Sequence, residues 1–97
     1  MKVPYQLLRA ARVALDISHV DLAKEASVSK RTLVRIEKPQ TVSDESLERV
    51  QAALEARGVQ FLSPEEGLGP GMRIPERMLN PPAIRRHEAG RQTEGRE

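Results

Sequence analysis

The chain has 97 residues, with 16 Lys and Arg against 14 Asp and Glu, a formal net charge of +2 and no cysteine. This length suits one small domain with a modest core, and without cysteine neither a disulfide nor a thiolate metal site can form. The N-terminal segment is unlike a signal peptide because Arg9, Arg12 and Asp16 interrupt its apolar residues, and no run of about 18 apolar residues would span a membrane. We therefore expect a cytoplasmic protein without a membrane partner.

Apolar residues at helical spacing predict two helices near the N-terminus. The first is predicted over residues 4–15, because Pro4 lacks the N–H that the first turn of a helix leaves unpaired. Asp16 ends it, since aspartate tolerates the turn conformations that a helix end requires. The second helix is predicted over residues 19–26, with the hydroxyl of Ser18 as its N-terminal cap.

Two further helices are predicted from the same kinds of cap and stop residues. The third covers residues 30–38, after the cap Ser29 and before Pro39, because a proline disfavours the helical conformation of the residue before it. The fourth begins after the cap Ser43 and ends before Gly58, a residue suited to the left-handed position that follows a helix. The chain up to this point is therefore predicted to be mainly α.

Beyond Gly58 the composition changes. Residues 59–62 and 72–74 are strand-like and flank the turn-rich stretch SPEEGLGPG, which predicts a β-hairpin over 59–74. The glycines of this stretch indicate a turn rather than a phosphate-binding loop, since no Lys-Ser or Lys-Thr follows them. Residues 75–97 contain five Arg, four Glu and three Pro but few large apolar residues, which predicts a disordered tail.

The third predicted helix separates its apolar from its charged side chains when it is projected at about 100° per residue. Leu33 and Ile36 fall on one side, with Glu37 and Thr32 at the edges of the opposite arc. That arc contains four cations and no acid: Lys30, Arg31, Arg35 and Lys38. A solvated amphipathic face would have a similar pattern. A cationic helix supported by a short capped helix, however, is how a helix-turn-helix enters the DNA major groove.

The run ISHVDLAKEASVSKRTLVRIEK, residues 17–38, resembles the lambda-repressor-like, Cro-type helix-turn-helix family of the xenobiotic-response-element class. Its matches to the family pattern S-Q-x-x-L-A-x-x-x-G-V-S-x-x-x-[IL]-x-x-[IL]-E are Ser18, Leu22, Ala23, Val28, Ser29, Leu33, Ile36 and Glu37. His19 replaces the usual Gln of the family, and Ser27 replaces the glycine of its turn. The resemblance covers about residues 5–62 and implies a four-helix DNA-binding domain over residues 4–62.

The resemblance also implies roles for single residues. The third helix would be the recognition helix, and the DNA-contacting positions would be Ser18, His19, Lys30, Arg31, Thr32, Arg35 and Lys38. Arg12 and Glu37 match a family ion pair that orients this helix and does not touch DNA. Because one recognition helix reads only a few base pairs of double-stranded DNA, a homodimer on a palindromic site is expected. The segment 59–74 could mediate dimerisation, or could instead fold on its own domain.

These observations predict a sequence-specific transcriptional regulator, most simply a repressor. The alternative is an antitoxin or adaptor that binds its operator through the same domain while residues 75–97 fold on a toxin or another protein partner. A third reading is a fold used only for protein contacts. An enzyme is not expected, because His19 and His87 are the only histidines and no residues have the spacing of a catalytic triad or a zinc site. No cofactor is expected either.

Overall fold

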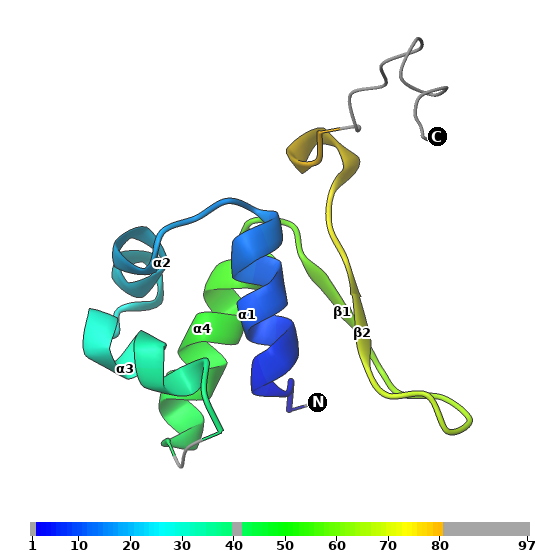
Figure 1. The fold of residues 1–97 in the computed structure, drawn as a ribbon, viewed down its shortest axis with the longest axis horizontal. Coiled ribbons are helices and arrows are strands. Elements are labelled where there is room, and N and C mark those ends of the chain that lie inside the picture. The colour runs from blue at the N-terminus through cyan, green and yellow to red at the C-terminus, as the bar shows by residue number, and fades with distance from the viewer. Residues whose placement is uncertain (1, 40–41, 81–97) are drawn as a thin grey trace, which may run out of the picture.

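The computed structural model describes residues 2–39 and 42–80. The fold is mainly α, as predicted, with a small antiparallel sheet at its C-terminal end. The elements in chain order are α1 (Tyr5–Ala14), α2 (His19–Ala26), α3 (Lys30–Ile36), α4 (Asp44–Ala56), β1 (Gln60–Leu62), β2 (Gly71–Arg73) and the 3-10 helix η1 (Glu76–Met78). In Figure 1, α1 and α4 stand between the α2–α3 pair and the β-hairpin.

Serine hydroxyls cap α2, α3 and α4 at the predicted positions. Each hydroxyl accepts a hydrogen bond from the backbone N–H three residues further on: Ser18 from Asp21 at 3.0 Å, Ser29 from Thr32 at 3.0 Å, and Ser43 from Ser46 at 3.2 Å. A cap of this kind satisfies one of the N–H groups that the first turn of a helix leaves unpaired. The sequence therefore fixes where these three helices begin.

The third helix is shorter than the predicted range 30–38. Helix α3 ends at Ile36, Glu37 is its C-cap, and Lys38 lies beyond the helix. The reason is Pro39, whose ring disfavours the helical conformation of the preceding residue. Lys38 therefore does not continue the helix, but its side chain is exposed just after the helix end.

Two non-glycine residues adopt the left-handed backbone conformation at helix ends. Asp16 follows α1 with a φ of 56°, and Ser27 follows α2 with a φ of 58°. The carbonyl of Ser27 accepts a hydrogen bond of 3.1 Å from Nη1 of Arg49 on α4. Serine thus takes the left-handed turn position where the family pattern has glycine, and α4 supports that turn.

The core is built from aliphatic side chains of all four helices. The largest side chains that are fully buried are Leu8, Leu22, Leu33, Ile36, Val50 and Leu54. Burying one such side chain stabilises a fold by about 2 kcal/mol. Two buried side chains come from α3, a helix of seven residues. Because an isolated helix this short is unstable in water, its conformation depends on this packing.

The β-hairpin folds on its own domain. Strands β1 and β2 pair antiparallel, with Phe61 opposite Met72. Both of these side chains pack against the core, as do Ile74 and Met78. Within this chain, residues 59–74 therefore pack against their own domain.

The predicted tail begins at residue 75, but the described fold continues past that point. Residues 76–78 form η1, and the side chain of Met78 reaches the core. Residues 81–97, on which the predicted disorder and the partner-binding alternative depend, lie outside the described residues. Within the described chain, no helix combines the length and the apolar character needed to cross a membrane.

An ion pair joins the second and fourth helices at the surface. The guanidinium of Arg57, which follows α4, donates from Nε to Glu25 Oε1 on α2 at 2.7 Å and makes a second contact with Oε2. The hydrogen bonds from Arg57 hold the pKa of the Glu25 carboxyl below its ordinary value. Because both side chains are partly exposed to water, the pair contributes little to stability.

We expect Gly58→Ala to be strongly destabilising. Gly58 has a φ of +101°, and a Cβ placed there would lie 2.6 Å from Cγ of Pro75. Backbone strain and this clash together should lower the free energy of unfolding by about 3 kcal/mol, measured by urea denaturation. Gly67→Ala is the matched control, since Gly67 has a φ of +83° but no neighbour within 4 Å. Equal losses in the two variants would contradict the close approach of Pro75.

Candidate nucleic-acid interface

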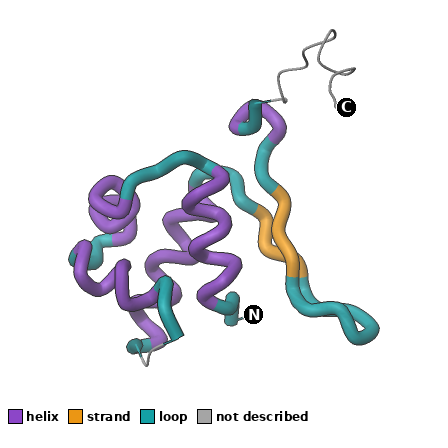
Figure 2. The backbone as a smooth tube through the Cα atoms, viewed as in Figure 1, coloured by secondary structure: helices purple, strands orange, loops and turns teal. Residues whose placement is uncertain are grey.

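The outer face of α3 is cationic, as the helical projection predicted. Lys30, Arg31 and Arg35 are exposed, whereas Leu33 and Ile36 on the opposite face are 0% and 1% exposed. A short loop joins α3 to α2, so the cationic helix is displayed on a supporting helix (Figure 2). The two helices have the arrangement that a helix-turn-helix requires.

The cations of this face are not neutralised by the described chain. Within residues 2–39 and 42–80, the ion pairs involve none of the four predicted positions Lys30, Arg31, Arg35 and Lys38. Exposed guanidinium and ammonium groups without an internal partner can bind the phosphates and base edges of a nucleic acid. We refer to these four side chains as the cationic face.

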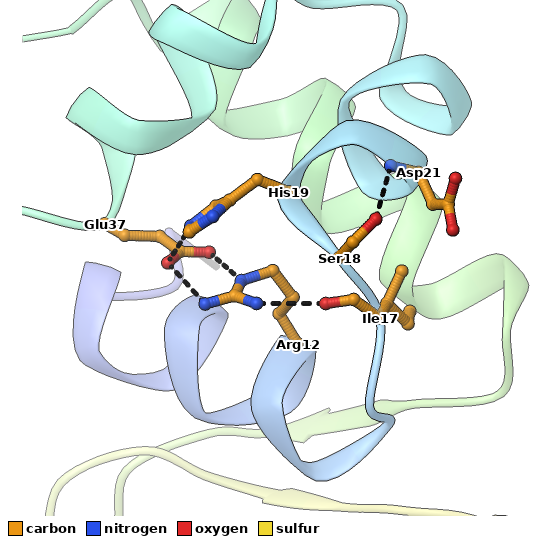
Figure 3. A network of polar contacts seen from close by, with 6 residues as sticks. All are labelled: Arg12, Ile17, Ser18, His19, Asp21 and Glu37. Atoms are coloured by element: carbon orange, nitrogen blue, oxygen red, sulfur yellow. Dashed lines mark hydrogen bonds and ion pairs between the residues drawn. The ribbon is translucent and has the colours of Figure 1, made fainter.

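A mostly buried ion pair holds the C-terminal end of α3. Arg12 of α1 donates to both carboxylate oxygens of Glu37, from Nε to Oε2 at 2.6 Å and from Nη2 to Oε1 at 3.1 Å. Its Nη1 donates to the carbonyl of Ile17, just before α2, at 2.9 Å (Figure 3). The side chains of Arg12 and Glu37 are 14% and 6% exposed. The structure thus contains the ion pair that the family resemblance implied.

His19 lies in this network instead of pointing freely into solvent. Its Nε2 lies 3.0 Å from Oε1 of Glu37, and its side chain is 32% exposed. An ionised carboxylate can only accept hydrogen bonds, so Nε2 carries the hydrogen. In a neutral ring Nδ1 is then an acceptor, and it becomes a donor only when the ring is protonated. Sequence spacing does not indicate this contact, because Glu37 is 18 residues away at the end of another helix.

Ser18 and Thr32 have structural partners as well. The hydroxyl of Ser18 accepts from the Asp21 N–H, which leaves its own hydrogen available to another group. Thr32 is half-buried, and its Oγ1 accepts a hydrogen bond of 2.9 Å from the hydroxyl of Ser29. Each side chain keeps one donor hydrogen, so both can still contact a phosphate oxygen.

A helix-turn-helix family model matches residues 8–60 of the chain. The match covers more than half of the sequence and includes all of α2, α3 and α4 with most of α1. No curated protein and no solved structure matches the chain.

We expect Arg12→Met to destabilise the fold by about 3–5 kcal/mol, because it leaves the buried carboxylate of Glu37 without its cation. Combining it with Glu37→Leu should recover much of this loss, since an apolar pair avoids burying an unpaired charge. Urea denaturation of both variants measures the difference.

The control for this prediction is a surface ion pair. Glu45 pairs with Arg49 four residues on, and their side chains are 73% and 47% exposed. Glu45→Gln should therefore cost less than about 1 kcal/mol. An Arg12→Met variant as stable as Glu45→Gln would show that the Arg12–Glu37 pair does not hold α3 in place.

Proposed function

The chain belongs to the lambda-repressor-like helix-turn-helix family, and we propose that it regulates transcription by binding double-stranded DNA sequence-specifically. The main support is the cationic face, whose four side chains have no ion-pair partner within the described residues. A face of one sign attracts the DNA backbone and accelerates its encounter with the protein.

In this proposal α3 lies in the major groove. Arg31 and Arg35 donate to O6 and N7 of guanine, a bidentate contact that discriminates against other bases by about 1–3 kcal/mol. Lys30, at the start of the same helix, also reaches base edges. The methyl group of Thr32 contacts a thymine methyl, or its hydroxyl donates to a phosphate.

Other residues of the site would position the protein on the backbone. Lys38, which lies just beyond α3, binds a phosphate. Ser18 and His19 lie at the N-terminal end of α2, where backbone N–H groups favour an anion. Contacts of this kind fix the register of the recognition helix and carry no sequence information themselves.

We further propose that the protein binds as a homodimer and represses. One α3 helix reads only a few base pairs, and two copies on a palindromic site double the length that is read. A dimer bound across a promoter prevents the polymerase from binding it without any additional domain.

Selection of bound duplexes from a random pool tests the proposal. The wild-type chain should enrich one motif, while Arg31→Ala and Arg35→Ala should each lose preference at one base pair, by about 1–3 kcal/mol, and keep their melting temperature. Lys38→Ala should weaken all duplexes nearly equally. Unchanged base preference in both arginine variants would contradict the assignment of α3 as the recognition helix.

A titration with duplexes of different design tests the dimer. Two half-sites on one face of the DNA, about one helical turn apart, should bind two chains cooperatively. Inserting about 5 base pairs between the half-sites places them on opposite faces and should abolish the cooperativity. Equal affinity for one and for two half-sites, with one chain bound to each duplex, would contradict a dimer.

A further inference from the structure

A small hollow lies where α1, α2 and the end of α3 meet. Its volume is about 160 Å³, and it is lined by Arg9, Arg12, His19, Val34, Glu37 and Lys38. The volume per molecule in liquid water is about 30 Å³, so the hollow accommodates a group of a few heavy atoms. Because Lys38 belongs both to this hollow and to the cationic face, the hollow is continuous with the surface that we propose for DNA.

The charges that line the hollow favour an anion. The lining contains three cations, Arg9, Arg12 and Lys38, against the single carboxylate of Glu37. That carboxylate is paired at both oxygens by Arg12, which reduces its repulsion of an incoming anion. Arg9 and Lys38 are exposed, and no ion pair within the described parts of the chain involves either of them.

We infer that this hollow binds one backbone phosphate of the DNA duplex, held between the guanidinium of Arg9 on α1 and the ammonium of Lys38 after α3. The inference rests on the proposed function and adds to it a contact from α1, outside the residues that carry the family pattern. A guanidinium and an ammonium are the side-chain groups that bind phosphate most strongly.

The chemistry of His19 explains why Arg9 is needed. In the neutral form of His19, the only N–H of the ring donates to Glu37. The ring therefore has no donor left for a phosphate. The family pattern has glutamine at the position of His19. The amide of a glutamine has two hydrogens and could donate one to each of two acceptors, such as Glu37 and a phosphate. With histidine at this position, Arg9 supplies the donors that the phosphate requires.

A phosphate in this hollow would bind to Arg9 and Lys38 at the point where three helical segments meet. Arg9 lies on α1, His19 begins α2 and Lys38 follows α3. The Arg12–Glu37 pair beneath it fixes the same three segments to one another. One phosphate contact would therefore set the angle at which α3 enters the groove, as backbone contacts do in DNA-binding proteins.

The test uses the full chain and a duplex that carries its selected motif. Arg9→Gln removes the charge and keeps part of the aliphatic stem, and affinity is measured over a range of salt concentrations. The slope of log K against log salt should become shallower by about 0.9 for each chain bound, with all sequences weakened by the same factor. Arg9→Lys should keep the wild-type slope, and Arg77→Ala, which removes an exposed cation in η1, should leave slope and affinity unchanged.

A duplex with a neutral methylphosphonate at one backbone position at a time locates the contact. At one position in each half-site the replacement should weaken the wild-type chain clearly more than it weakens Arg9→Gln, which keeps only Lys38 as a partner for that phosphate. If Arg9→Gln keeps the wild-type slope and the same methylphosphonate sensitivity while Arg31→Ala still alters base preference, the inference fails and the proposed function stands. If the wild-type chain binds no duplex, the proposed function fails and the inference fails with it.

Discussion

The carboxylate of Glu37 determines how the helices are placed relative to one another. Glu37 is the C-cap residue of α3, and its carboxylate accepts two hydrogen bonds from Arg12 on α1 and lies within hydrogen-bond distance of His19 on α2. A buried ion pair contributes little net stability, because desolvation offsets its attraction. Its geometry is directional, however, whereas the aliphatic contacts of Leu22 or Leu33 are not. We infer that the core supplies the stability and that Glu37 supplies the orientation of α3.

The same carboxylate determines the electrostatics of the cationic face. If Glu37 had no partner, its negative charge next to Lys38 would repel a phosphate. It would also attract the side chains of the cationic face, which would then be less available to DNA. Arg12 cancels this charge at the point where α3 ends, and it is itself only 14% exposed, so it does not compete for the ligand. Placing the pair below the surface thus leaves Lys30, Arg31 and Arg35 to dominate the field outside.

Local sequence signals predicted most of the fold. The caps Ser18 and Ser29 placed the starts of α2 and α3 correctly, because a cap bonds to a backbone group only three residues away. The end of α3 was placed too late, since the effect of Pro39 on its neighbour competes with helical periodicity. The contact of His19 with Glu37 could not be read from spacing, because tertiary packing brings the two together. Sequence spacing does not single out Arg9 for the same reason, as only the fold brings it into one hollow with Lys38.

The net charge of this chain does not indicate a DNA-binding surface, whereas the positions of its charged residues do. Of the acidic side chains in the described residues, Glu25, Glu37, Asp44 and Glu45 each pair with a cation on another element or another turn of the same helix. None of these pairs involves a residue of the cationic face, so these four acids neutralise other cations and leave those of the cationic face free. A chain with a net charge of only +2 can therefore present a concentrated positive surface. Such a surface attracts DNA at long range, and the screening of that attraction by salt distinguishes it from a face that binds protein through apolar contacts.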